Sequence, residues 1–195
     1  KVNFTDVLGQ VRYWDNMIYN HLRKENKVIP QKKEHEKNEK FEGAYVKDPQ
    51  VGMHKWIMSF DLNSLYPHLI MQYNISPETL VDKSEMVEGM VDKILNGKVK
   101  TDKEYCMTPN GALFRKDIRG FLPELMEKVY DDRVKYKKLM LEAKQEFEDT
   151  GDPAILKRIS RYENIQMAKK ISLNSAYGAI GNSYFRYYDL MVATA

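Results

Sequence analysis

The chain has 195 residues, of which 43% are hydrophobic and 30% charged, enough for a buried core and one or two domains. A formal net charge of only +3 gives weak support for a polyanionic partner, so any argument for one depends on where the lysines and arginines lie. The single cysteine, Cys106, excludes an internal disulfide; with no signal peptide and no apolar run near the roughly 20 residues of a membrane span, we expect no membrane partner.

The first predicted element is an amphipathic helix. Val11, Trp14, Ile18 and Leu22 recur at helical spacing, and the pattern ends near Lys24. The following stretch PQKKEHEKNEKFEG, residues 30–43, carries charges of both signs and few apolar residues. It is predicted to be a solvated connector.

A strand-to-helix turn is predicted next. The segment KWIMSF, residues 55–60, is short, apolar and aromatic, which indicates a buried strand. Asp61 stands at its end. Asn63 or Ser64 can cap a following helix, which is predicted to run to about Tyr73.

A β-hairpin is predicted at Asn110-Gly111, which stands between apolar residues as in a two-residue loop. With the helices on either side, it predicts an α+β fold. A long helix should follow, from Pro123 to about Asp149.

A second long helix is predicted directly after it. Asp152 suits the N-cap and Pro153 the first helical position, and the helix should run to about Ala179. The short turn between the two helices predicts an antiparallel hairpin, with arms on the order of 40 Å long at about 1.5 Å per residue.

The Asp61 turn has the residue types of a metal-phosphate site. A carboxylate past a buried strand points into the crevice where open sheets bind ligands, and the amides of Ser64, Leu65 and Tyr66 would lie at a helix N-terminus. Mg²⁺ could bridge carboxylate and phosphate there. The simpler alternatives are that Asp61 is only an N-cap and that Tyr66 is only a core aromatic.

The predicted helical hairpin has a candidate anion site. Arg133 and Lys137 share one face of its first helix, and Lys170, Asn174 and Tyr177 share one face of its second. In an antiparallel pair these faces can be neighbours, and the cluster would suit a triphosphate with its base or sugar nearby. An ordinary solvated face is the alternative, because glutamates alternate with these cations.

Three further features of the sequence bear on these candidate sites. Gly178 and Gly181 interrupt a helical pattern at a cost of about 1 kcal/mol each, which indicates close approach of another group. The DTGD segment, 149–152, suits a hairpin tip better than a metal loop. Neither His54 nor His68 has partners at zinc-site spacing.

Two motifs carry a family resemblance. DLNSLYPHLI, residues 61–70, resembles motif A of family B DNA polymerases, Asp-x-x-Ser-Leu-Tyr-Pro. KKISLNSAYGAIGN, residues 169–182, resembles their motif B, Lys-x-x-x-Asn-Ser-x-Tyr-Gly, in the right order and with a helical hairpin between. NKVIPQ, EGAYVKDP, NISPET and YFRYYDL are similar to the replicative polymerases of tailed bacteriophages.

The resemblance implies a partial polymerase fold with template-directed DNA synthesis. Residues 1–40 would be a helix and connector from an upstream module, 41–120 the N-terminal part of the palm with motif A, 121–182 the fingers hairpin with motif B, and 183–195 a return toward the palm. It also implies primer-template DNA and dNTP as partners, a sliding clamp bound through regions outside the chain, and action in the cytoplasm of a phage-infected bacterium.

The family assigns roles by position. Asp61 would hold both catalytic Mg²⁺ ions, with the Leu62 carbonyl on one of them, while Ser64 and Leu65 would contact phosphates through their amides. The deoxyribose would pack on Tyr66, which would exclude a 2′-hydroxyl.

Other positions would grip the triphosphate or contact the template and base pair. The triphosphate grip would come from Arg133, Lys137 and Lys170, and contacts to the nascent base pair or template from Asn174, Tyr177, Gly178, Gly43 and Ala44. Phe41 stands where the family's Tyr-x-Gly-Gly/Ala element has Tyr, so a hydroxyl contact is not expected there.

The family's second catalytic carboxylate, in a Tyr-x-Asp-Thr-Asp segment, has no match here. With a start at Lys1 and an end at MVATA, the chain is expected to be a piece of a longer protein, inactive in primer extension by itself. The alternatives are a non-catalytic nucleic-acid-binding module and a structural helical hairpin. A pure binder would not need Asp61, which would repel a phosphate backbone without a metal.

Overall fold

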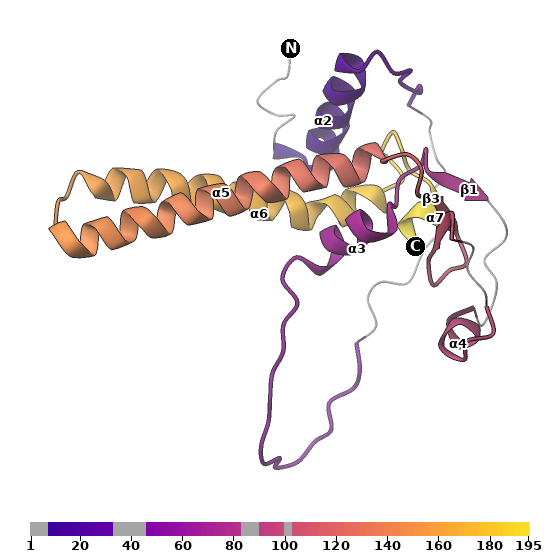
Figure 1. Ribbon diagram of the computed structural model, residues 1–195, viewed down its shortest axis with the longest axis horizontal. Helices are drawn as coiled ribbons and strands as arrows, with labels where there is room; N and C mark the ends of the chain where they lie inside the picture. Colours follow the sequence, from indigo (N-terminus) through magenta and orange to yellow (C-terminus); the bar gives the residue numbers. More distant parts are fainter. Residues whose placement is uncertain (1–7, 33–45, 83–89, 100–102) are drawn as a thin grey trace.

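A computed structural model describes residues 8–32, 46–82, 90–99 and 103–195 (Figure 1). Helices and a small antiparallel sheet make an α+β fold, as predicted. None of the described helices is both long and apolar enough to cross a membrane. The elements in chain order are α2 (Gln10–Lys24), α3 (Leu65–Tyr73), β1 (Leu80–Asp82), α4 (Met90–Leu95), β2 (Tyr105–Met107), β3 (Leu113–Arg115), α5 (Phe121–Thr150), α6 (Ile155–Ile180) and α7 (Leu190–Ala193).

The predicted helical hairpin is confirmed: α5 and α6 run antiparallel and project away from the rest of the chain (Figure 1). Gly151 ends α5 with φ +68°, a left-handed conformation that glycine adopts without strain. The Asp152 carboxylate accepts a hydrogen bond from the Ala154 N–H at 2.9 Å. Residues 153–154 form a turn and α6 begins at Ile155 with Ala154 at its N-cap, so the predicted N-cap at Asp152 and first helical position at Pro153 are wrong.

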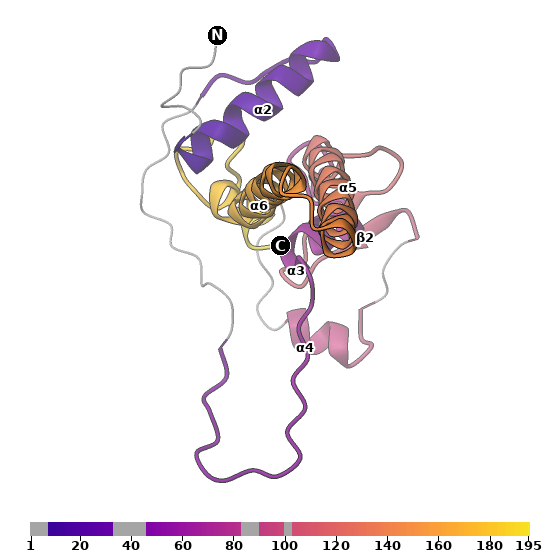
Figure 2. The same ribbon diagram turned by 90° about the vertical axis from the view of Figure 1, so that its left-hand side faces the viewer.

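The core lies at the base of this hairpin, where α2 crosses α6 (Figure 2). The predicted α2 is confirmed, and Trp14, Ile18 and Leu22 are buried on one face of it. The Trp14 indole Nε1 donates to the Ser172 carbonyl of α6 at 3.2 Å, so the largest side chain of α2 is held by both packing and a hydrogen bond.

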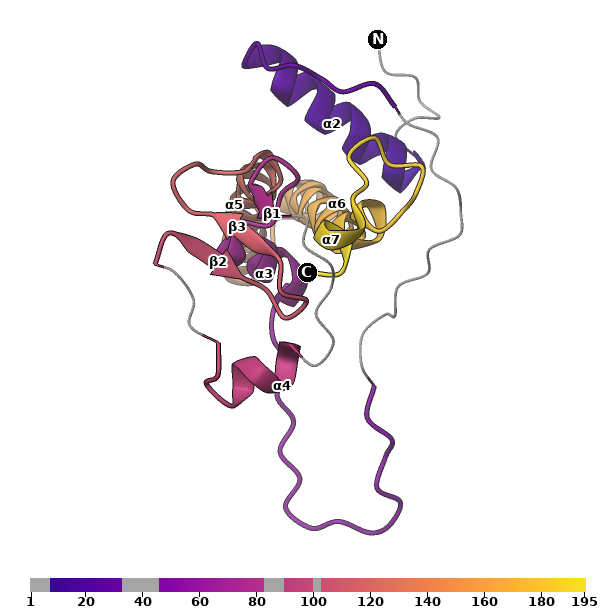
Figure 3. The same cartoon turned by 90° about the vertical axis from the view of Figure 1, so that its right-hand side faces the viewer.

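The sheet has the order β1-β3-β2, with both pairs antiparallel (Figure 3). The predicted β2–β3 hairpin is confirmed, but its loop is longer than two residues. The Thr108 N–H bonds the Ala112 carbonyl, the Gly111 N–H bonds the Thr108 carbonyl, and Gly111 has φ +87°. This is a turn followed by a left-handed residue, a loop that Pro109 after Thr108 favours.

The start of α5 is fixed by side chains from the segment after α3. Asn74 Oδ1 accepts from the Gly120 N–H at 3.0 Å, and Glu78 Oε1 accepts from the Phe121 N–H. A Cβ at Gly120 would lie 2.6 Å from the Ser76 Cβ, so no larger residue fits without a shift. The hairpin base is thereby fastened to the end of α3.

The buried strand predicted at 55–60 is wrong. Residues 46–62 have no helix or strand and form an extended loop away from the core (Figure 2). Trp56, Ile57 and Phe60 are 97%, 77% and 84% exposed. A strand needs a neighbour for its N–H and C=O groups, and none of the described segments pairs with this one, so the apolar pattern alone does not produce a strand here.

Candidate active site

An open groove of about 650 Å³ lies between the loop before α3 and the base of the hairpin. It joins a turn early in the chain to residues of both long helices. Its lining residues are Phe60, Asp61, Leu62, Asn63, Ser64, Leu65, Tyr66, Arg133, Lys170 and Asn174. The structure therefore brings together most of the site residues predicted from the two motifs.

Phe60 and Asn63 also line the groove and were not among the predicted site residues. Both residues are within two positions of Asp61 in the sequence, and this closeness to the predicted carboxylate is the signal that could have identified them as site residues. Gly43 and Ala44 lie outside the described residues, and their predicted template contact stays a prediction.

Ser64 has an unusual backbone and a tight set of contacts. It stands at the N-cap position of α3 with φ 53° and ψ 45°, a left-handed conformation that costs a non-glycine residue about 1–2 kcal/mol. Its carbonyl accepts from the His68 N–H at 3.1 Å and from His68 Nδ1 at 2.9 Å. Its hydroxyl accepts from Arg133 Nη1 at 3.1 Å.

Of the two predicted caps, Asn63 or Ser64, the structure has Ser64 at the N-cap position, but its hydroxyl makes no capping hydrogen bond and instead contacts α5. A left-handed residue followed by a helix turns successive N–H groups toward one point, a common anion-binding arrangement. The amides of Leu65 and Tyr66 in the first turn of α3 have no acceptor among the described residues.

Asp61 is exposed on the groove wall, and among the described residues it makes no hydrogen bond or ion pair. It does not cap α3, so the simpler reading of Asp61 as an N-cap is not supported. An exposed carboxylate beside unpaired amides has oxygen ligands available for a hard cation such as Mg²⁺. Asp61 is the one carboxylate among the residues that line the groove.

Tyr66 stacks on Tyr177 of α6, with ring centroids 4.7 Å apart and an angle of 11° between the ring planes. Tyr66 is 41% exposed, so it is not simply a core aromatic. Burial raises the pKa of Tyr177 above its ordinary value. The stack connects the turn after Asp61 to motif B.

Gly178 follows in α6, and a Cβ there would meet no atom of the described chain within 4 Å. The close approach predicted from its glycine is thus not found within the described part of this chain. Its missing side chain instead leaves open space beside Tyr177.

The cations around the groove differ in their partners. Lys169 of α6 donates to Asp132 of α5 at 2.8 Å and so connects the helices. Among the described residues, Arg133 and Lys170 have no acidic partner, although both line the groove. Lys137, one helical turn after Arg133 on α5, is not among the residues that line the groove, and its predicted contact with the triphosphate stays a prediction.

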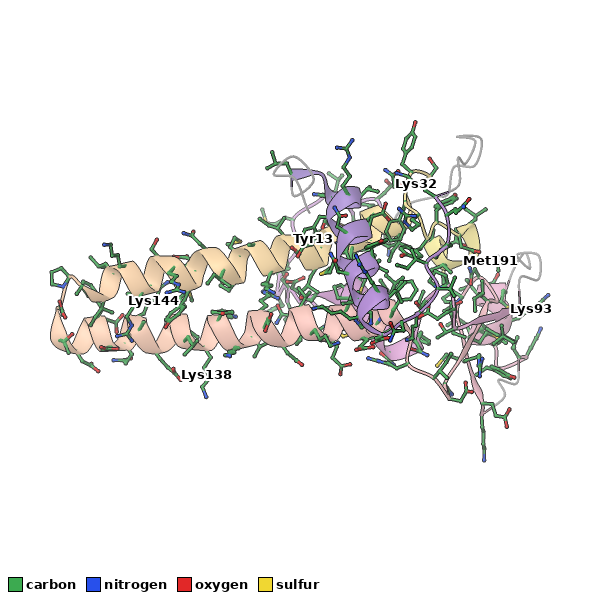
Figure 4. All side chains as sticks on the ribbon, turned by 90° about the horizontal axis from the view of Figure 1, so that it is seen from above. Tyr13, Lys32, Lys93, Lys138, Lys144 and Met191 are labelled. Atoms are coloured by element: carbon green, nitrogen blue, oxygen red, sulfur yellow. The ribbon has the colours of Figure 1, made fainter. Side chains whose placement is uncertain are left out.

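Farther along the hairpin, charge pairs dominate. Arg158 of α6 contacts Glu146 of α5 at 2.8 Å. Lys138 projects outward from α5 and lies 3.9 Å from Glu142 (Figure 4). The alternative of a solvated, charge-balanced face therefore holds for these outer pairs but not for the groove.

The comparisons with known proteins agree with the two motifs. The family model described as DNA polymerase family B matches residues 7–195. The chain is 34% identical, over its whole length, to the DNA-directed DNA polymerases of Escherichia phage RB69 and Enterobacteria phage T4, and covers 26% of each. It is 36% identical to DNA polymerase 1 of Pyrococcus abyssi over 82% of this chain and 18% of that protein.

A solved family B DNA polymerase from the hyperthermophilic archaeon Pyrobaculum calidifontis has a similar fold. The TM-score is 0.64 at 26% identity, over 95% of this chain and 21% of that one. The chain thus spans about a quarter of the length of its phage relatives. On the match over residues 7–195 and the motifs at both walls of the groove, this chain belongs to the family B DNA polymerases.

Proposed function

We propose that this chain supplies the nucleotide-binding centre of a replicative DNA-directed DNA polymerase, which transfers a nucleotidyl group from dNTP to a primer 3′-hydroxyl. One observation carries the proposal: Asp61, the first turn of α3 and the cations of both hairpin arms share one groove. A nucleic-acid-binding module could use the cations but has no need of the carboxylate.

The triphosphate would be held from two sides. The amides of Ser64 and Leu65 would donate to phosphate oxygens at the N-terminus of α3, where the helix dipole also favours negative charge. Arg133 and Lys170 would neutralise phosphate charge from the opposite wall. Lys137 remains a candidate for the outer phosphates.

Asp61 and the Leu62 carbonyl would hold the metal. Both offer hard oxygen ligands, and among the described residues Asp61 has no competing partner, which fits Mg²⁺. Two bound Mg²⁺ ions would supply activation of the primer hydroxyl and neutralisation of the leaving pyrophosphate. The residues that line the groove include one carboxylate, so the proposal requires a second acidic residue from another part of the polymerase.

The sugar and base would lie against the aromatic and amide side chains. Tyr66, held by the Tyr177 ring, would pack on the deoxyribose and leave no room for a 2′-hydroxyl. Asn174 and Tyr177 would lie beside the nascent base pair, where Gly178 leaves open space.

In the whole polymerase we propose the division stated above: an upstream helix and connector (1–40), palm (41–120), fingers (121–182) and a return to the palm (183–195). The partners would be primer-template DNA and dNTP, with a sliding clamp bound elsewhere. The phage relatives favour action in the cytoplasm of an infected bacterium.

The test is Asp61→Asn in the full-length polymerase, with Asp131→Asn, an exposed carboxylate of α5, as the matched control. We expect Asp61→Asn to lower dNTP incorporation more than about a hundredfold and to leave primer-template affinity nearly unchanged. The control should keep both. Unchanged incorporation in Asp61→Asn would contradict the proposal. If the unsubstituted protein incorporates no dNTP and Asp61→Asn binds DNA more tightly than it does, the non-catalytic nucleic-acid-binding module is favoured.

A further inference from the structure

Away from the groove, a histidine and two carboxylates converge where α2 meets the start of α5. His21 and Glu25 are one turn apart at the end of α2, and Glu124 is in the first turn of α5. His21 Nε2 lies 3.2 Å from Glu25 Oε1 and 3.5 Å from Glu124 Oε2. All three ligand atoms lie within 4.8 Å of one another.

The His21 side chain is only 9% exposed. Its Nε2 is buried and, although two oxygens are close, has no hydrogen bond of acceptable geometry among the described residues. A buried ring nitrogen in this position is costly unless a further group contacts it.

The carboxylates are oriented by their other oxygens. Glu25 Oε2 contacts Lys27 Nζ at 2.6 Å, and Glu124 Oε1 contacts Lys128 Nζ at 2.5 Å. The oxygen that each carboxylate presents to His21 is therefore the one that its lysine leaves available. Outer partners of this kind commonly orient metal ligands.

We propose that His21, Glu25 and Glu124 form a site for one divalent transition-metal ion of the Zn²⁺ type, independent of the polymerase reaction. In a tetrahedral zinc site with bonds of about 2.0–2.1 Å, neighbouring ligand atoms lie about 3.3 Å apart. The two observed separations, 3.2 and 3.5 Å, bracket that value. Water would take the fourth position.

The ligand set selects against Mg²⁺, because an imidazole nitrogen suits Zn²⁺ and Mg²⁺ prefers oxygen and water. The ion would join the last turn of α2 to the first turn of α5 and so hold α2 against the base of the hairpin. The competing arrangement is a protonated His21 in ion pairs with both carboxylates, which needs no metal.

The experiment uses the full-length polymerase that carries Asp61→Asn, in excess Mg²⁺. Under these conditions the catalytic site, whose ligands are all oxygen atoms, does not contribute to the binding of the probe ion. Co²⁺ is titrated as the spectroscopic probe and is then displaced by Zn²⁺. The variants are His21→Gln and Glu25→Gln, and the matched control is His54→Gln, an exposed histidine whose ring contacts the Gln50 carbonyl.

We expect one bound Co²⁺ with the intense visible absorption of a four- or five-coordinate ion. His21→Gln and Glu25→Gln should each weaken binding at least about tenfold, and His54→Gln should not. If His21→Gln fails to fold, Glu25→Gln decides, since that side chain is 33% exposed at the end of α2. Absence of this absorption in the parent, or equal binding by Glu25→Gln, overturns the proposal and leaves the ion pairs alone.

Discussion

Removal of the Tyr177 ring tests whether the stack in the groove supports sugar selection. The Tyr66 and Tyr177 rings are parallel within 11° at 4.7 Å, and Tyr66 is otherwise 41% exposed. Such a pair contributes about 0.5–1.5 kcal/mol beyond its buried area. If that energy holds Tyr66 in place, Tyr177→Ala should lower discrimination against rNTP about 2- to 12-fold.

The assay is single-nucleotide incorporation by the full-length polymerase, with kcat/KM measured for matched dNTP and rNTP. The ratio of the two values isolates sugar selection, because a general loss at the base pair lowers both alike. Tyr177→Phe is the control, since it keeps the ring, and should keep the ratio. An unchanged ratio in Tyr177→Ala would refute the reasoning even if both rates fell.

Three further outcomes are expected. Lys170→Gln should lower kcat/KM for dNTP roughly 10- to 150-fold, which corresponds to the loss of a charge-assisted contact of about 1.5–3 kcal/mol. Lys169→Gln is the control and should change kcat/KM little, because Lys169 already pairs with Asp132. Asn74→Ala should lower the free energy of unfolding by about 3 kcal/mol or more in denaturant titrations. The reason is that the buried Asn74 amide donates to the Arg115 and Ile118 carbonyls and accepts from the Gly120 N–H. A loss below about 1 kcal/mol would contradict this. Burial raises the pKa of Tyr187 from 10.0 to about 12, so the folded state keeps a proton that the unfolded chain releases, and stability should fall as pH rises from 10 to 12. Tyr187→Phe should make that fall smaller in thermal melts, and an unchanged fall would contradict the assignment.

Local sequence signals predicted α2, α3, α5 and α6, but not the short helices α4 and α7. Apolar spacing located α2, and Gly151 and Asp152 located the tip of the α5–α6 hairpin, because periodicity, glycine conformation and turn residues depend on near neighbours in the chain. The same signals failed at 55–60, since a strand also depends on a partner that a local pattern does not contain.

For the site, the two motifs and their spacing could be identified in the sequence alone. They were sufficient to predict that a carboxylate, backbone amides and cations surround a bound nucleotide. Only the tertiary structure decided that Arg133 bonds Ser64 and that Lys137 does not line the groove. It also decided that Lys169 pairs with Asp132, whereas Lys170 has no acidic partner among the described residues. It also placed Glu124 beside His21, about a hundred residues earlier in the chain. Each of these depends on how α5 lies against α2, α3 and α6, which is set by packing between segments that are far apart in sequence.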